Sequence, residues 1–179
     1  MPEIEVRPVS VDEIPVLVSL EHYGKSDYVW QMERLVEESQ IVITFREVRL
    51  PRSVKVEYPY SMESLPERLR QQTILLAAVL KGEIVGYIGV EERLATRTAW
   101  VAHLAVAVDC RREGIASALM LAAQSWASRR GLRKMILETP SKNAPAIRMA
   151  LKLGFEFSGY NDQYYANQDI ALFFSSMLR

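Results

Sequence analysis

Residues 103–116, HLAVAVDCRREGIA, decide the fold that we expect for this chain. The segment begins as an apolar run, passes through a short polar turn with a single glycine, Gly114, and enters a stretch with helical periodicity. A junction of this kind directs the backbone N–H groups of residues 112–116 into one small space, where the helix terminus adds partial positive charge. The segment is therefore suited to holding a phosphate, although an ordinary turn with solvated arginines would show a similar pattern.

Strand and helix signals alternate along the rest of the chain. Apolar runs predict strands at residues 4–8, 41–50, 53–58, 73–80, 84–90, 99–108, 134–138, 160–165 and 170–177, the second of them ending at Pro51. Caps and apolar stripes predict helices at residues 11–20, 27–38, 61–72, 114–130 and 143–153. Gly82 supplies a tight turn that predicts a hairpin between the fourth and fifth strands. The order predicts one mixed α/β domain over residues 1–179, with an antiparallel front and a β-α-β-α centre.

The composition excludes several classes of protein. Of the 179 residues, 49% are apolar and 25% are charged, so disorder and fibrous repeats are not expected. The 22 Lys and Arg residues balance 22 Asp and Glu residues, which disfavours nucleic acid as the main partner. The apolar runs fall short of the ~20 residues that span a bilayer, and the acidic start is no signal peptide. We therefore expect a soluble, cytoplasmic protein without a membrane partner.

The single cysteine, Cys110, excludes an internal disulfide and a multi-cysteine metal site. No set of His, Cys and carboxylate residues has the spacing of metal ligands, so no metal is expected. Cys110 has no obvious histidine partner in the sequence, and we interpret it as structural rather than as an acyl-carrying nucleophile.

Several motifs together resemble the GNAT superfamily of acyl-coenzyme A-dependent N-acyltransferases. Residues 111–116, RREGIA, match its Arg/Gln-x-x-Gly-x-Gly/Ala pyrophosphate loop, and residues 137–155 resemble its strand, its Asn-x-x-Ala helix start and its closing Gly-Phe. The resemblance extends from residue 74 to residue 178. It implies a GNAT fold, with a central mixed, mostly antiparallel sheet flanked by helices, and acetyl-coenzyme A as cosubstrate.

Further features are similar to one branch of that superfamily, the streptothricin acetyltransferases and their relatives. They are Leu50-Pro51-Arg52 before Tyr58-Pro59, the strand end Leu137-Glu138-Thr139, and Tyr165-Ala166-Asn167 after the Gly-Phe pair. This branch does not fix the substrate.

The resemblance also implies the residues that bind acetyl-coenzyme A. Main-chain groups of Leu104 and Val106 would pair with the pantetheine arm, and an N–H near Val106 would polarise the acetyl carbonyl. Asn143 would hydrogen-bond the pantetheine while capping its helix, although a cap alone is the alternative. The pyrophosphate would be held by the loop residues Arg111, Arg112, Glu113, Gly114, Ile115 and Ala116.

Acyl transfer to an amine requires that a proton be removed, because an alkylamine has a pKa of ~10.4. Glu138 matches the position of a general base in some relatives; the alternative is a solvated carboxylate that pairs with Lys134 or Lys142. Glu91 and Glu92 would attract a cationic substrate, or are simply solvated.

His103 lies in an apolar strand, where it would relay protons through water or be a satisfied core histidine. Many relatives place a tyrosine general acid where this chain has Ala150, so that role is vacant. Of the nearby tyrosines Tyr160, Tyr164 and Tyr165, the last best matches the branch pattern, although each of them could simply pack between strands.

These observations lead to three hypotheses about function. The first is an N-acetyltransferase that moves an acetyl group directly to a primary amine of a small molecule in a ternary complex. The second is a protein or peptide N-acetyltransferase, which an open groove beside Glu138 would support. The third is a catalytically weak acyl-coenzyme A-binding sensor or interaction domain, suggested by Ala150. The apolar strand at residues 170–178 also suggests the edge of a homodimer.

Overall fold

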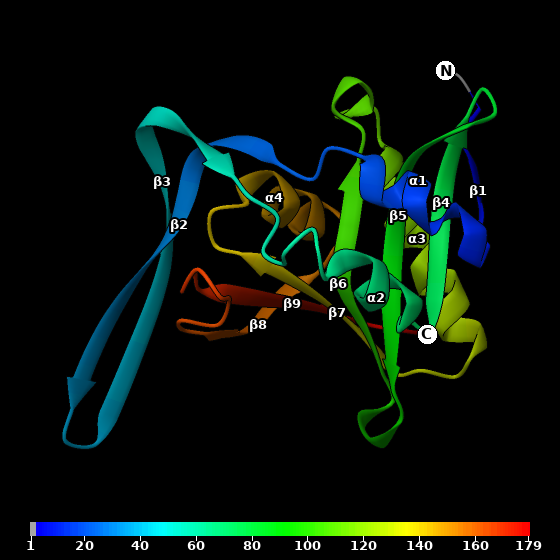
Figure 1. Cartoon of the computed structure of the whole chain (residues 1–179). Coiled ribbons are helices and arrows are strands. Elements are labelled where there is room, and N and C mark those ends of the chain that lie inside the picture. Colours follow the sequence, from blue (N-terminus) through cyan, green and yellow to red (C-terminus); the bar gives the residue numbers. More distant parts are fainter. Residues whose placement is uncertain (1–2) are drawn as a thin grey trace.

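A seven-stranded sheet forms the centre of the computed structural model, which describes residues 3–179 (Figure 1). Its strand order is β1-β4-β5-β6-β7-β9-β8, and every neighbouring pair is antiparallel except β6 and β7. The strands are β1 (Glu5–Pro8), β4 (Ile74–Leu80), β5 (Glu83–Arg93), β6 (Thr98–Val106), β7 (Lys134–Pro140), β8 (Glu156–Asn161) and β9 (Ala171–Met177). The mixed, mostly antiparallel sheet flanked by helices is thus confirmed.

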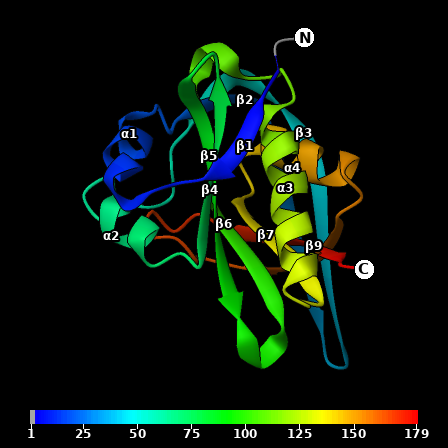
Figure 2. The same ribbon diagram turned by 90° about the vertical axis from the view of Figure 1, so that its right-hand side faces the viewer.

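Helices cover both faces of this sheet, as Figure 2 shows with the sheet between them. One face carries α1 (Ile14–Ser19) and α2 (Leu65–Arg70), and the other carries α3 (Ile115–Arg129) and α4 (Ala144–Lys152). Short 3₁₀ turns are η1 (Val11–Glu13), η2 (Leu94–Thr96) and η3 (Val108–Cys110). The larger apolar cluster lies under α3 and α4, and a smaller one around Leu17, Leu65 and Tyr87 lies under α1 and α2.

The hairpin between β4 and β5 forms as predicted. Lys81 and Gly82 both have positive φ, at 51° and 82°, which is the backbone of a two-residue turn whose twist matches the flanking strands. The helix expected at residues 11–20 is confirmed in part, because its first turn is 3₁₀ and only Ile14–Ser19 is α-helical.

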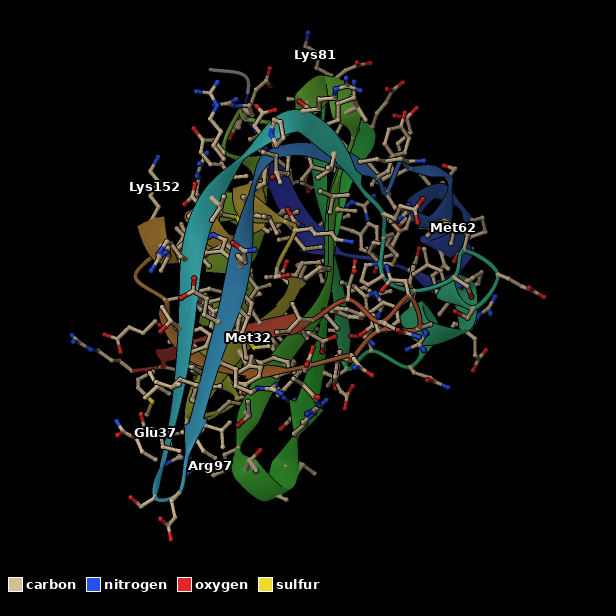
Figure 3. All side chains as sticks on the ribbon, turned by 90° about the vertical axis from the view of Figure 1, so that its left-hand side faces the viewer. Met32, Glu37, Met62, Lys81, Arg97 and Lys152 are labelled. Carbon is tan, nitrogen blue, oxygen red and sulfur yellow. The ribbon has the colours of Figure 1, made fainter. Side chains whose placement is uncertain are left out.

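The helix predicted at residues 27–38 is wrong, because that segment belongs to a long two-stranded ribbon of β2 (Gly24–Glu37) and β3 (Gln40–Val56). Its sequence allows either structure, and pairing with β3 overrides the local helical pattern. Trp30 packs against the main core, and its backbone N–H donates to Ser141 O at 3.0 Å. Figure 3 views the ribbon face on, with Met32 along β2 and Glu37 near the tip.

The predicted end of a strand at Pro51 is also wrong, because β3 continues through it to Val56. The register shifts there: Tyr28 pairs with Arg49, while Ser26 pairs with Val54. Pro51 therefore lies in an irregular, unpaired stretch of β3. No hydrogen bond between strands is lost there, although proline has no backbone N–H to donate.

The closing strands differ in position from the prediction. β8 ends at Asn161, so Tyr164 and Tyr165 lie in the turn before β9 rather than in a strand. β9 pairs with β7 on one side and β8 on the other, so it is an internal strand and cannot be the edge of a dimer. No helix within residues 3–179 is long and apolar enough to cross a bilayer.

Candidate active site

The site begins where β6 and β7 separate. The two strands are in register for four residue pairs, from Thr98 with Lys134 to Val101 with Leu137, and beyond them each strand continues without the other. We call the space between their diverging ends the β6–β7 gap. It leaves one edge of β6 without a strand partner just before residues 111–116.

The free edge of β6 presents the main-chain groups of Leu104 and Val106. The N–H of Ala107 donates to Val85 O at 2.7 Å, so Ala107 faces β5. Because successive residues of a strand alternate in direction, the N–H and C=O groups of Leu104 and Val106 face the gap. Both residues named from the sequence thus lie where an extended ligand would meet backbone donors and acceptors.

Residues 111–116, which we call the Gly114 turn, follow at the end of that edge. Gly114 has φ of 84° and precedes the first residue of α3, and Arg112 has φ of 66°. None of the backbone N–H groups from Arg112 to Ser117 donates a hydrogen bond to any part of residues 3–179. A row of free donors at the start of a fifteen-residue helix is a ready site for an anion.

The Arg111 side chain makes two hydrogen bonds to backbone carbonyl groups. Its Nε donates to Val106 O at 2.9 Å and its Nη2 donates to Glu21 O at 2.9 Å. The guanidinium therefore ties the Gly114 turn to β6 and to the segment before β2. The side chains of Arg112 and Glu113 are exposed, while Ile115 is buried beneath the helix.

Asn143 caps α4 as predicted. Its Oδ1 accepts a hydrogen bond from the N–H of Ala146 at 3.3 Å, and its side-chain amide N–H₂ makes no hydrogen bond within residues 3–179. The amide is half-buried and remains available as a donor.

Glu138 is buried, with 7% of it exposed, and its carboxyl group accepts three hydrogen bonds. Its Oε1 accepts from the Tyr60 hydroxyl at 2.6 Å, and its Oε2 accepts from Trp100 Nε1 at 2.7 Å and from the Tyr164 hydroxyl at 3.3 Å. A carboxylate has about four acceptor positions, so the second position on Oε1 is left open.

Aromatic rings enclose this carboxylate. Tyr165, 5% exposed, packs edge-on against Tyr60 at 6.0 Å and against Tyr164 at 5.0 Å between ring centroids. We call Tyr60, Trp100, Glu138, Tyr164 and Tyr165 the aromatic chamber. Burial and the nearby carboxylate raise the pKa of all three phenols, which keeps them protonated. Tyr164 is 38% exposed and marks the side that meets solvent.

Two arginine side chains stack on aromatic rings of the chamber. The Arg68 guanidinium lies over the Tyr60 ring at 4.2 Å, and that of Arg93 lies over the Trp100 ring at 3.7 Å. Neither forms an ion pair with Glu138, and no other cation does so within residues 3–179. The printed hydrogen bonds to the Glu138 oxygens therefore all come from neutral donors.

The three glutamates named from the sequence have different surroundings. Glu138 is neither solvated nor paired with lysine, since Lys142 pairs with Asp169 at 2.8 Å. Glu91 and Glu92 instead pair with arginines, Arg93 at 3.4 Å and Arg130 at 2.6 Å.

The remaining candidates fall on both sides of the sheet. His103 is 2% exposed, its Nδ1 bonds the Tyr58 hydroxyl, and its ring centroid lies 5.3 Å from that of Tyr60. Ala150 is wholly buried in the core under α4, and Tyr160 packs against Phe45 on the ribbon. Only His103 of these three adjoins the chamber.

Sequence reasoning missed Tyr60 and Trp100, two of the three donors to Glu138. Tyr60 follows the Tyr58-Pro59 pair that supported the branch resemblance, and this adjacency was the available signal. Trp100 lies on β6 beside β7, so its role depends on pairing that the sequence does not state.

The family model described as the acetyltransferase (GNAT) family matches residues 40–155. The chain belongs to the GNAT family. This match confirms the superfamily named from the motifs, and it includes the β6–β7 gap, the Gly114 turn and Asn143.

Two curated relatives of this GNAT protein are similar over part of their length. The L-amino acid N-acetyltransferase AaaT of Escherichia coli (strain K12) is 32% identical over 50% of this chain and 57% of its own. The streptothricin acetyltransferase of Streptomyces lavendulae is 31% identical over 47% of this chain and 44% of its own, which agrees with the branch resemblance. The chain thus spans about half the length of the curated relatives that it matches.

A solved structure shares the fold of this GNAT chain over nearly its whole length. It is a candidate streptothricin acetyltransferase from Bacillus anthracis strain Ames, determined in complex with acetyl coenzyme A. The TM-score is 0.76 at 17% identity, and the match covers 98% of this chain and 100% of the other.

Proposed function

We propose that this protein is an acetyl-coenzyme A-dependent N-acetyltransferase that acetylates a primary amine of a small molecule. The observation that carries the proposal is the enclosed carboxylate of Glu138, which adjoins the β6–β7 gap while having no cationic partner in the described part of the chain. A site that gathers negative charge among aromatic rings is complementary to an ammonium group.

The donor side of the reaction uses backbone groups. The diphosphate of acetyl-coenzyme A would lie on the free N–H groups of the Gly114 turn, with the exposed side chain of Arg112 nearby. The pantetheine arm would pair with Leu104 and Val106 along the free edge of β6 and meet the amide of Asn143. Arg111 would shape this turn through its carbonyl contacts instead of binding the diphosphate directly.

The acceptor side uses side chains. An alkylammonium entering beside Tyr164 would meet the rings of Tyr60 and Trp100 and place one N–H on the open position of Glu138 Oε1. The enclosed chamber favours a small amine over a protein chain, because only 7% of Glu138 is exposed.

Proton transfer then prepares the nucleophile. Glu138 takes one proton from the ammonium, and the nitrogen lone pair attacks the thioester carbonyl carbon. The carbonyl oxygen becomes an oxyanion that accepts a hydrogen bond from the N–H of Val106, and its collapse breaks the C–S bond. The departing thiolate takes a proton from Tyr165 or from water, and the extra proton on the amide nitrogen replaces it on the tyrosinate or hydroxide. Glu138 then releases its proton to solvent. Ala150 supplies no acid.

A thiol-release assay tests this proposal. The whole chain is incubated with acetyl-coenzyme A and a panel of alkylamines, polyamines, aminoglycosides, streptothricin, L-amino acids and peptides. Steady thiol release with at least one small amine, together with an acetylated product of the expected mass, is the expected result. Tight acetyl-coenzyme A binding without turnover across the panel would instead favour the sensor hypothesis, and turnover with peptides alone would overturn the small-molecule acceptor.

A further inference from the structure

We propose that Asp169 is a positioning residue for acetyl transfer, which holds Tyr164 and Tyr165 in place beside the carboxylate of the aromatic chamber. It also joins these tyrosines to the turn that leads to Asn143. This inference rests on the proposed function, because it concerns the alignment of the acceptor side with the donor side. Asp169 lies in residues 162–170, which connect β8 to β9 and which we call the tyrosine loop (Figure 1).

The main-chain carbonyl of Asp169 fixes the backbone of both tyrosines. It accepts hydrogen bonds from the N–H of Tyr164 at 3.1 Å and from the N–H of Tyr165 at 3.3 Å. The Tyr164 hydroxyl donates to Glu138 Oε2 at 3.3 Å, and the Tyr165 ring packs edge-on against Tyr60. A displacement of the Asp169 carbonyl would therefore move two rings of the aromatic chamber together.

The side chain of Asp169 fixes the position of that carbonyl. Its Oδ1 accepts a hydrogen bond from Lys142 Nζ at 2.8 Å, and its Oδ2 accepts one from Asn167 Nδ2 at 3.0 Å. The backbone N–H of Asp169 donates to Asn167 Oδ1 at 3.0 Å. The side chain is 19% exposed, so its ion pair with Lys142 is partly protected from screening by salt and water.

Lys142 connects Asp169 to the donor side. It lies in the turn between β7 and Asn143, the cap residue of α4. The N–H of the preceding residue, Ser141, donates to Ile170 O at 3.1 Å, so this turn and the tyrosine loop are joined at two adjacent positions. Asp169 therefore holds the rings of the acceptor side in register with the Asn143 amide of the donor side.

The tyrosine loop contains two residues with an unfavourable backbone. Gln163 and Gln168 have positive φ, at 50° and 69°, a region that residues with a side chain rarely adopt. They lie on either side of the two tyrosines. Conformations of this kind persist only where surrounding contacts hold them, and they are concentrated at functional sites. The contacts of Asp169, next to Gln168, provide such support.

Asp169→Asn tests this role, because it removes the charge and keeps the size of the side chain. With an amine that turns over in the thiol-release panel, we expect kcat/KM for the amine to fall at least about tenfold, since a misplacement of ~1 Å can cost about 10²-fold. The KM for acetyl-coenzyme A should stay within about threefold, because the Gly114 turn is unchanged. Asp162→Asn, in the same loop and paired with Arg34 at 3.4 Å, is the matched control and should leave both values unchanged.

A double-mutant cycle with Tyr164→Phe separates positioning from a general loss of structure. The loss in kcat/KM from Asp169→Asn should be at least about threefold smaller when the Tyr164 hydroxyl is already absent, because the two residues act through one contact with Glu138. A general loss of structure would instead add in full to the loss from Tyr164→Phe. An undiminished effect in that background would overturn the positioning role.

Lys142→Met breaks the same ion pair from the other side and replaces Asp169→Asn if that variant does not fold. It should reproduce the loss in kcat/KM, whereas Lys142→Arg, which keeps the charge, should retain most of the wild-type value. The double variant of Lys142→Met with Asp169→Asn should lose no more than either single variant. Full activity of Lys142→Met would show that the ion pair does not position the loop.

The two proposals fail in different ways. Wild-type values of kcat/KM in both Asp169→Asn and Lys142→Met would overturn the positioning role alone. Absence of turnover in the wild type with every amine would contradict the proposed function, and the positioning role with it.

Discussion

The two sides of the candidate site are built from different parts of the polypeptide. The donor side, from Leu104 through the Gly114 turn, is one continuous segment that offers mainly backbone groups. The acceptor side gathers side chains from residues 60, 100, 138 and 164–165, which lie on separate elements. Backbone geometry depends on glycine and on helix starts, whereas the chamber depends on the tertiary fold. The donor side is thus suited to one fixed ligand, and the acceptor side can change residue by residue.

Glu138→Gln should separate the two sides most strongly. We expect kcat to fall by roughly 10²–10⁴-fold, because the amide cannot take a proton and its N–H₂ opposes the donors of the chamber. The affinity for acetyl-coenzyme A, measured by calorimetry, should stay within about twofold, since the proposed diphosphate site at the Gly114 turn does not include Glu138. Glu156→Gln on β8 is the control, and an unchanged kcat in Glu138→Gln would remove Glu138 from the reaction.

Acid should destabilise the acceptor side through His103. Its pKa is about 4 in the folded chain and 6.5 in a free histidine, so the unfolded state binds the extra proton between these values. The contribution of neutral His103 to the free energy of unfolding is therefore complete above pH 6.5. As the pH falls toward 4, about 3 kcal/mol of it is lost.

Urea unfolding of the wild type and of His103→Gln at pH 7 and pH 4 measures this loss. The variant should lose correspondingly less free energy of unfolding between the two pH values. Equal losses in both proteins would contradict the buried, neutral state of His103.

Two tyrosines of the aromatic chamber should contribute differently to the free energy of unfolding. Tyr60 donates to Glu138 at 2.6 Å and Tyr164 at 3.3 Å, and a hydrogen bond to a charged group contributes about 1.5–3 kcal/mol. Tyr60→Phe should lower the free energy of unfolding by about 2 kcal/mol, and Tyr164→Phe, at the exposed side, by less than about 1 kcal/mol. Chemical denaturation of both variants checks the order, which a larger effect of Tyr164→Phe would reverse.

Gly114→Ala should affect the donor side alone. A side chain at φ of 84° costs about 1–2 kcal/mol, even though an added Cβ meets no atom within 4 Å. Gly154→Ala is a matched control, with the same φ of 84° and the same open space. Both variants should lose similar stability, but only Gly114→Ala should weaken acetyl-coenzyme A binding, by about tenfold. Equal affinity in calorimetry would place the diphosphate away from this turn.

The sequence predicted the donor side of the candidate site more completely than the acceptor side. The Gly114 turn and the Asn143 cap depend on local backbone rules, and the structure has both where the motifs indicated. Glu138 was named as one of two alternatives, but its donors Tyr60 and Trp100 were not, because no local pattern states which strands become neighbours.

The β2–β3 ribbon was misread, and the backbone contacts of Arg111 were not foreseen. The ribbon segment satisfies helical spacing as well as strand spacing, and only its pairing with β3 decides between them. Arg111 fits a phosphate motif by type and position, but two backbone carbonyls already occupy its guanidinium.

The junction between β6 and β7 divides the sheet into two halves that are also separate in the sequence. Every strand on one side of it, β1, β4, β5 and β6, precedes α3, and every strand on the other side, β7, β8 and β9, follows it. A cut after Gly131, where α3 has ended, would leave each fragment with all the strands of its own half-sheet. The two fragments would then be natural partners for reassembly in trans, with Glu138 on one and the Gly114 turn on the other.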